Sequence, residues 1–487
     1  MADTPRGQFL ADGKFPPCPV SGLGTRPDSS FVHRLRYDWF RRKIPQNRQH
    51  LPKPSCWKPR IAHNFPGTDF VRIENEQGAC EPFWDGCTMK HTRVLPGGIF
   101  LAACIAAHVG VAVEPSTKPA QLPACPVEIR SQDLRPHIEF LASADLRGRS
   151  GQDARRAADY VLEHFQQLKL RPLFPENSYV QSIPGPAGED GRRPIIGQNI
   201  GAWLEGSDPE LKHECLVIGV HYDHLGVREG SVYHGADDNA SGVAMMLEVA
   251  RRLCTGTTCP RRSVLFVGFD LEEHMLWGSR WFASHPPRPL EHVKLFLTAD
   301  MIGRSLGDLP LPAVFVLGSE HAPLLKELLD RAGQPEGLEV ARLGIDLIGT
   351  RSDYGPFRDR KVPFLFFSTG EHPDYHTPRD TADRIDYEKA ARVSSLVLQV
   401  VRQAGDADTA PQWVDQVALD LDEPRALERI TRLLLEAEAQ RPLTDVQRYL
   451  VTTVRHRVQR ILERGTMTAD DRLWLIRMSQ LLLLSVF

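Results

Sequence analysis

Residues 234–242 read HGADDNASG, a pair of adjacent aspartates followed by small residues. Apolar residues at helical spacing begin near residue 239 and continue to 253. Apolar runs with the composition of buried strands lie on either side, at 214–220 and 262–269. The aspartates are therefore expected in a loop between a strand and a helix, which is where open α/β sheets bind ligands.

Strands and helices alternate over most of the chain, from about residue 132 to 404. This alternation predicts an α/β fold, a three-layer αβα sandwich with a central, mostly parallel, twisted sheet. The other expected strands are 198–204, 293–299, 313–317 and 362–367, and the other expected helices are 150–170, 322–332 and 386–404.

After residue 405 the strand pattern stops. Three amphipathic segments follow, at 423–440, 445–464 and 470–487, each with a leucine-rich stripe on one face. We expect a C-terminal α-helical extension, 405–487, that packs on the preceding domain. A helical hairpin that binds a partner is the alternative.

Composition sets the broad class of the protein. The chain has 487 residues, 41% of them hydrophobic and 25% charged, which is ordinary for a globular protein. Lys and Arg number 59 against 62 Asp and Glu, a net charge of -3. This balance gives no electrostatic reason to expect nucleic-acid binding.

The N-terminal region differs from the rest. Residues 1–88 show no sustained helix or strand period and are expected to be irregular. From Met89 a basic head precedes an uncharged run, 94–113, and a polar linker, 114–131. This order is typical of an export signal. We therefore expect translation to start at Met89, so that residues 1–88 are not part of the mature protein. The mature protein is expected to be periplasmic, cell-surface or secreted. Alternatively, the segment is a lipoprotein signal, and Cys104 carries a lipid that anchors the protein to a membrane. The uncharged run 94–113 could also be an internal helix or a membrane span.

Two cysteines flank a short loop between a predicted helix and a predicted strand. Cys254 and Cys259 enclose Thr-Gly-Thr-Thr. Because export would place them in an oxidising compartment, we expect a local disulfide, against the alternative of two free thiols.

Four further segments carry His, Asp or Glu where a predicted strand ends. The carboxyl ends of parallel strands meet at one edge of a sheet, so these side chains are expected to converge with the two aspartates. Crowded carboxylates repel one another unless a cation is present, and His with carboxylates suits zinc or a related divalent ion. The segments are VIGVHYDHLG (217–226), FVGFDLEEHMLWGS (266–279), LFLTADMIGR (295–304) and FFSTGEHPDYHTPRDT (366–381).

The five segments resemble, in their order along the chain, the motifs of the co-catalytic dizinc aminopeptidases of the bacterial leucyl aminopeptidase type. This family is related to the glutaminyl cyclases. The matching motifs are HYDH, GADDNASG, EE followed by Leu-x-Gly-Ser, DMIG and YHTxxDT. The resemblance covers roughly residues 133–404, which are expected to form a zinc peptidase catalytic domain (132–404). It covers neither the N-terminal region nor the C-terminal helices.

The resemblance implies two Zn²⁺ ions per chain and a ligand set for them. His221 and Asp300 would ligate one ion, and Glu273 and His376 the other. Asp237 would bridge the two ions, with a cis peptide bond between it and the next residue.

The resemblance also implies which residues act around the metals. Glu272 would be the general base for a water held between the two ions. Asp223 would orient His221 through its other ring nitrogen. His224 and His234 flank the site in the sequence and are interpreted as structural residues or as outer neighbours of the ligands.

Two positions depart from the family pattern. After the glutamate pair the family usually has x-Gly-Leu, whereas this chain has Met275 at the glycine position, which is expected to fill space there. In the segment SDYGPF, Tyr354 stands where His is common. Arg351 and Tyr354 are candidates to hold the substrate, with packing or surface roles equally expected.

The function favoured by the resemblance is that of an exported zinc-dependent aminopeptidase, a metallo-exopeptidase that removes N-terminal residues from peptides. The alternatives on the same fold are a single-zinc aminoacyltransferase like the glutaminyl cyclases and a carboxypeptidase that uses Arg351. A non-catalytic receptor is disfavoured because such relatives lose ligands, and none is lost here.

Overall fold

The computed structural model describes residues 122–188 and 190–486. The predicted irregular segment 1–88, the predicted export signal 89–113 with Cys104, and the first part of the linker, 114–121, lie outside these residues. Within the described part of the chain, no helix combines the length and the apolar character that crossing a membrane requires.

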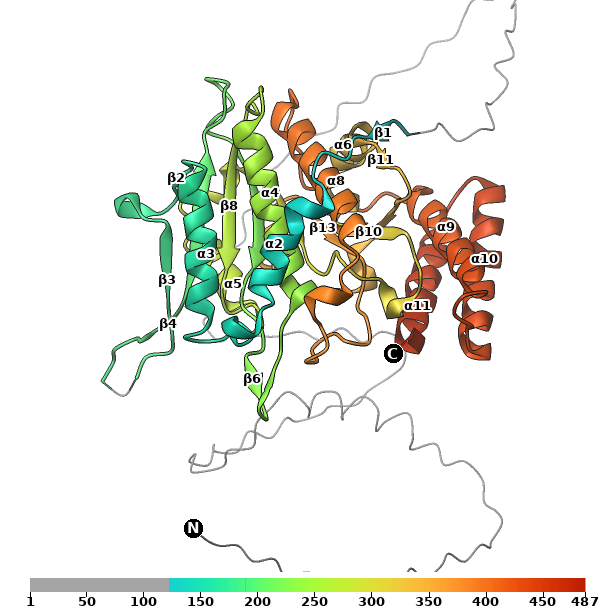
Figure 1. The fold of residues 1–487 in the computed structure, drawn as a ribbon. Helices are drawn as coiled ribbons and strands as arrows, with labels where there is room; N and C mark the ends of the chain where they lie inside the picture. The colour runs from blue at the N-terminus through green and yellow to red at the C-terminus, as the bar shows by residue number, and fades with distance from the viewer. Residues whose placement is uncertain (1–121, 189, 487) are drawn as a thin grey trace, which may run out of the picture. The chain divides into compact units, whose positions relative to one another are not determined.

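A nine-stranded sheet forms the centre of the molecule (Figure 1). The strands β13, β9, β5 and β8 pair in parallel, as predicted, whereas β4 is antiparallel to β8 and β10 is antiparallel to β13. The sheet is therefore parallel in its middle and mixed overall. Its order is β12 (Glu339–Leu343), β10 (Ala313–Leu317), β13 (Phe364–Ser368), β9 (Val293–Ala299), β5 (Cys215–His221), β8 (Ser263–Phe269), β4 (Ile195–Leu204) and β2 (Arg171–Pro172), with β3 (Val180–Pro184) also paired to β4.

The register of the central strands brings the predicted motifs together. His221 at the end of β5 is level with Phe269 at the end of β8. The strand β9 ends at Ala299, on the other side of β5. The residues that follow these strands therefore leave the sheet at one edge.

Helices cover both faces of the sheet, which confirms the three-layer prediction. The core on one face contains residues of α2 (Ser131–Leu141), α3 (Ala154–Gln167), α4 (Gly242–Thr255), α6 (Pro323–Ala332) and α8 (Tyr387–Asp406). The core on the other contains residues of α5 (Trp277–Ser284), α7 (Gly355–Arg358), α9 (Asp422–Ala437), α10 (Asp445–Arg464) and α11 (Ala469–Val486).

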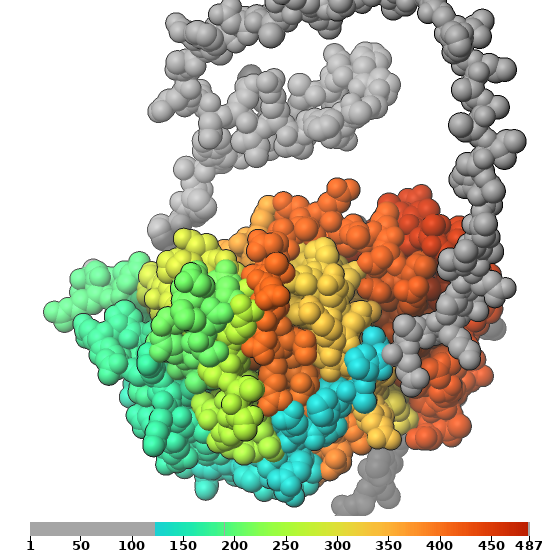
Figure 2. All heavy atoms as spheres, turned by 90° about the horizontal axis from the view of Figure 1, so that it is seen from above, coloured from blue at the N-terminus to red at the C-terminus, as the bar shows by residue number. Residues whose placement is uncertain are grey.

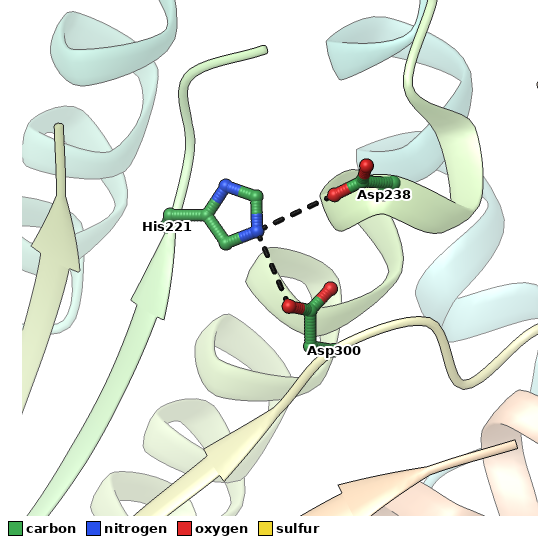
Figure 3. A group of neighbouring side chains, drawn as sticks. All are labelled: His221, Asp238 and Asp300. Carbon is green, nitrogen blue, oxygen red and sulfur yellow. Dashed lines mark ion pairs between the residues drawn. The ribbon is translucent and has the colours of Figure 1, made fainter. Parts of the chain in front are cut away.

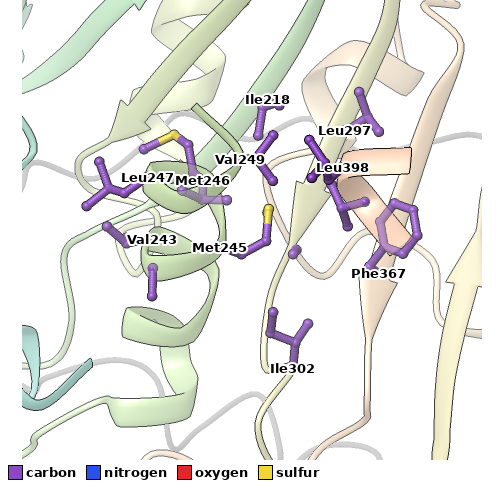
Figure 4. Close-up of a cluster of buried hydrophobic side chains, with 14 of the residues drawn as sticks. Ile218, Val243, Met245, Met246, Leu247, Val249, Leu297, Ile302, Phe367 and Leu398 are labelled. Carbon is purple, nitrogen blue, oxygen red and sulfur yellow. The ribbon is translucent and has the colours of Figure 1, made fainter. Parts of the chain in front are cut away.

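Strand β5 shows why the central strands are apolar throughout. Leu216 and Ile218 belong to the first core, and Cys215 and Val217 belong to the second, so successive residues are buried on opposite faces. In Figure 4, Met245 of α4 lies in the first core together with Ile218 and Leu297 of the sheet.

The C-terminal helices form one end of the described unit, and the strands β2 to β4 form the other (Figure 2). Helix α9 packs on β12, the last strand of the sheet, and α10 and α11 follow. Asp471, in the first turn of α11, is buried and pairs with Arg457 and Arg464 of α10. The predicted helical extension is thus present and packed on the sheet domain.

Three smaller features complete the fold. The segment between residues 170 and 198 contains β2, β3 and the start of β4, and β3 and β4 pair as an antiparallel hairpin. Two short sheets pair β1 (Ala124–Cys125) with β11 (Gln334–Pro335), and β6 (Val227–Arg228) with β7 (Ser231–Val232). Cys254 and Cys259 are free thiols, so the expected disulfide is absent from the structure.

Candidate metal centre

Polar side chains from all five motifs meet at the carboxyl edge of the sheet. His221 is the last residue of β5, Asp300 follows β9 directly, and Asp238 lies in the turn before α4. Glu273 comes from the loop after β8, and His376 comes from the loop after β13. The convergence predicted from the motifs is confirmed.

A first group of ligands surrounds His221 (Figure 3). Its Nε2 atom lies 3.4 Å from Oδ1 of Asp238 and 3.5 Å from Oδ2 of Asp300. Zinc binds such nitrogen and oxygen atoms at about 2.0–2.2 Å, so two ligands at tetrahedral angles are about 3.4 Å apart. One zinc ion fits this spacing.

A second group shares Asp238 with the first. Nε2 of His376 lies 3.0 Å from Oδ2 of Asp238 and 3.2 Å from Oε1 of Glu273. Nδ1 of His224 lies 3.0 Å from the same Glu273 oxygen. Asp238 therefore presents one carboxylate oxygen to each group, as a bridging ligand must.

The predicted bridging role of Asp237 is wrong by one position. Oδ1 of Asp237 accepts a hydrogen bond from the backbone N–H of Gly303 at 2.6 Å, and Oδ2 lies 3.5 Å from Nε2 of His372. The cis peptide bond likewise joins Asp238 to Asn239 rather than Asp237 to Asp238. Neighbouring side chains point in different directions, and the doubled aspartate does not reveal which of the two faces the site.

Two further carboxylates hold the backbone that carries these ligands. Asp223 accepts hydrogen bonds from the N–H groups of Glu272, at 3.0 Å, and Glu273, at 3.3 Å. Asp380 accepts from the N–H groups of Asp237 and Asp238. The carboxylate of Asp223 lies 3.7 Å from Nδ1 of His221, so its hydrogen bonds position the glutamate pair rather than the histidine.

Arg149 holds two of the site's loops, and sequence reasoning missed it. The side chain is fully buried, and its guanidinium donates to one carbonyl oxygen before the motif segments and to others within the first two of them. An arginine in a short polar segment looks like a surface residue, so the sequence contains no sign of this role. The accepting carbonyls are those of Leu141 (2.6 Å), Tyr222 (2.8 Å), His234 (2.6 Å), Gly235 (2.9 Å) and Asp238 (3.4 Å).

Buried polar atoms without partners mark where a cation fits. Nε2 of His221, Oδ2 of Asp238 and Oε1 of Glu273 are shielded from solvent and form no hydrogen bond within the described residues. Such atoms are rare in native proteins unless an ion or water satisfies them. Burial lowers the pKa of His376, but Asp238 and Glu273 outweigh it and raise that pKa to about 10. The site is therefore strongly attractive to positive charge, and a divalent cation would compete with this proton.

Glu272 stands beside the ligands without joining either group. Its backbone is fixed by Asp223, and no ion pair of its carboxylate appears among the described residues. Burial raises the pKa of Glu272 well above its usual range, Glu273 and Asp353 add to this effect, and His221 opposes it. Burial and the neighbouring carboxylates therefore make Glu272 a stronger proton acceptor than a glutamate in solvent.

Asp353 is a buried carboxylate that the sequence did not single out. It belongs to the SDYGPF segment, and within the described structure neither carboxylate oxygen has a hydrogen bond of acceptable geometry. Burial raises its pKa to about 7, opposed by the nearby charge of His221. It adds to the negative charge near His221.

Comparison with known proteins agrees with this geometry. Residues 199–401 match the model of peptidase family M28, and this range contains all five motifs. Over this segment the chain is similar to the M28 peptidases. The family predicted from the motifs is thus confirmed.

Three curated proteins show the range of the M28 relatives. Aminopeptidase YwaD of Bacillus subtilis is 26% identical over 42% of this chain and 44% of its own length. YfbL of Escherichia coli is 26% identical over 58% of this chain and 90% of its own length. The glutaminyl-peptide cyclotransferase of Boiga dendrophila is 28% identical over 39% of this chain and 61% of its own length. The chain therefore spans less than half of YwaD but most of YfbL.

The two candidate substrate residues differ in accessibility. Tyr354 is fully buried, stacks on Phe364, and donates its hydroxyl hydrogen to the carbonyl of Gly349 at 2.5 Å. Of the two roles expected for Tyr354, the structure shows the packing role, because its ring is part of the core. The Arg351 side chain is 50% exposed and lies 3.4 Å from Glu371, and its role in binding stays a prediction.

Met275, at the position where the family usually has glycine, does not fill the interior. Its φ of 65° lies in the left-handed region that glycine adopts most easily. Its side chain is 74% exposed. Met275 therefore places an apolar side chain in solvent two residues after Glu273.

Proposed function

We propose that this protein is a zinc-dependent aminopeptidase that holds two zinc ions at the carboxyl edge of its sheet. The observation that supports this most directly is Asp238, whose two oxygens face two separate groups of ligands. His221 with Asp300 would hold one ion, and Glu273 with His376 would hold the other. A single-zinc site, as in the cyclase alternative, leaves one of these groups without a cation.

Zinc ions bound here would polarise the substrate carbonyl and lower the pKa of a water molecule at the site. The chain's own contribution to proton transfer comes from Glu272. Its carboxylate accepts a proton from the attacking water and delivers it to the amine that leaves the scissile bond. Asp223 keeps Glu272 in place through the backbone hydrogen bond.

The charge of the site favours an aminopeptidase over a carboxypeptidase. Asp223, Glu272 and Asp353 surround the ligands and are not among the proposed metal ligands themselves. Carboxylates attract the protonated amino terminus of a peptide and repel a terminal carboxylate. Arg351, which the carboxypeptidase alternative needs, already lies beside Glu371.

The test combines metal analysis with an assay panel. Two zincs per chain and cleavage of aminoacyl-anilides, lost on chelation, are expected. One zinc with cyclisation of N-terminal Gln peptides would support the cyclase alternative, and release of C-terminal residues would support the carboxypeptidase.

The Glu272→Gln variant tests the proposed base. We expect it to keep both zincs and to lose about 10²–10⁴-fold in turnover, the usual contribution of a positioned acid-base group. Glu291→Gln, at an exposed glutamate before β9, is the control and should match the unaltered protein. Retained turnover in Glu272→Gln would remove that residue from the role.

We also propose that the protein is exported and acts on peptides outside the cytoplasm. The sequence from Met89 to residue 113 supports this, with cleavage after Ala112 or lipid attachment at Cys104 as the two routes. N-terminal sequencing and mass measurement of the mature chain distinguish them, and a mature chain that begins near Met1 would contradict both.

A further inference from the structure

His224 is a fully buried histidine inside the second ligand group. Its side chain is 0% exposed, and neither ring nitrogen has a hydrogen-bond partner of acceptable geometry among the described residues. A Cβ atom on Gly235 would come within 2.6 Å of the ring, so this glycine leaves the ring the space it occupies. The backbone N–H of His224 donates to the carbonyl of Arg149 at 3.0 Å, which fixes the start of the side chain.

The distances from His224 are those of a ligand. Nδ1 lies 3.0 Å from Oε1 of Glu273 and 3.7 Å from Oδ2 of Asp238. Two ligands of one zinc ion are at most about 4.4 Å apart, because each bond is about 2.0–2.2 Å long. One ligand atom each from His224, Asp238 and Glu273 lies within 4.8 Å of the others. Nδ1 therefore faces the same position as the ligand atoms of Glu273 and Asp238.

We propose that Nδ1 of His224 is an additional ligand of the zinc ion on the Glu273 side. This inference rests on the proposed zinc site and goes beyond its expected ligand set. The ion would then have four protein ligands, from His224, Asp238, Glu273 and His376. The ion beside His221 would have three, from His221, Asp238 and Asp300.

Unequal ligand numbers give the two ions different properties. Four protein ligands are typical of tightly held structural zinc, whereas three leave a position free for water or substrate. The Glu273-side ion is therefore expected to bind first and more tightly. The ion beside His221 is expected to exchange more readily.

The number of coordinating histidines can be counted directly by NMR. The full-length protein is labelled with [¹⁵N]histidine and loaded with ¹¹³Cd, a magnetic substitute for zinc. Couplings to three histidine nitrogens are expected: Nε2 of His221, Nε2 of His376 and Nδ1 of His224. Two coupled nitrogens, both Nε2, with two bound metals would overturn the inference and leave the proposed function intact, whereas the absence of bound metal would overturn both.

Variants give a second, independent readout. His224→Ala should weaken the tighter of two zinc affinities by at least about 100-fold, as measured by competition with a chelator, since loss of even an outer partner costs 10–100-fold. His224→Asn, whose amide oxygen lies near the place of Nδ1, should be intermediate. His234→Ala is the control, because the ring of His234 bonds to the carbonyl of Ala142 instead. Unchanged affinity in His224→Ala would overturn the inference.

Discussion

Replacing Arg149 by lysine should destabilise the protein and loosen the metal site together. The guanidinium makes four hydrogen bonds of 2.6–2.9 Å to backbone carbonyls, three of them in the loops that carry His221 and Asp238. Lysine keeps the charge but has one nitrogen with three N–H groups on an unbranched chain. It cannot satisfy acceptors on all sides of a planar guanidinium, so at least two buried carbonyls lose their donors.

The size of the effect follows from the number of lost donors. A buried polar group left without a partner costs about 1–3 kcal/mol, so two of them cost about 2–6 kcal/mol. For a unit of roughly 360 residues the entropy of unfolding is about 0.8 kcal/mol per kelvin, so each kcal/mol lowers Tm by about 1.3 °C. The Arg149→Lys variant should therefore melt about 3–8 °C below the unaltered protein.

Calorimetry of the zinc-loaded and zinc-free proteins provides the measurement. The destabilisation should be present in both, and zinc affinity should fall about 10–100-fold because the backbone around Asp238 is no longer held. Arg156→Lys is the matched control, since Arg156 is exposed and bonds to one surface carbonyl, and it should change Tm by less than about 1 °C. A Tm within about 2 °C of the unaltered protein, with full zinc affinity, would refute the role of Arg149.

Three further substitutions test the choice of bridging aspartate and the packing of the C-terminal helices. Asp238→Asn should abolish high-affinity binding of both zincs. Asp237→Asn should weaken zinc binding by about 10–100-fold, which is the cost of altering a residue that contacts the site without binding the metal. Metal titration that showed the reverse order would restore Asp237 as the bridge. Burial opposes ionisation of Asp471, but its hydrogen bonds with Thr468, Arg464 and Arg457 lower its pKa below the usual range. A lowered folded-state pKa stabilises the protein above the unfolded value of about 4 and loses this effect as pH falls toward the folded value. Asp471→Asn should therefore lower Tm at pH 7, and the difference should shrink below about pH 4; a constant difference down to pH 3 would contradict this.

The central strands and helices could be predicted because burial leaves a simple pattern. Strands β5 and β8 are buried on both faces, so every residue except His221 at the end of β5 is apolar or small, and the sequence shows them as continuous runs. Strand direction leaves no such pattern. Whether β4 runs parallel or antiparallel to β8 depends on the connections through the β3–β4 hairpin, and this explains why the mixed outer parts of the sheet were not foreseen.

The site was predicted where a motif assigns one residue to one role, and it was missed where roles depend on orientation. His221, Glu273, Asp300 and His376 lie where the motifs placed them. The choice within the aspartate pair depends on which carboxylate faces the sheet edge, and sequence spacing does not report that. His224 was placed outside the ligand groups because a histidine in a motif is as often structural as functional, and only its distance to Glu273 changes that interpretation.

The packing of α9 has a consequence for where the protein can be divided. Leu427 and Ile430 of this helix share a core with Ala341 and Leu343 of β12, and Arg429 pairs with Glu339 on the same strand. The family match ends at residue 401, before this helix begins. The boundary of the peptidase homology is therefore not the boundary of an autonomous folding unit, and a fragment cut at that position would leave its outermost strand without a cover.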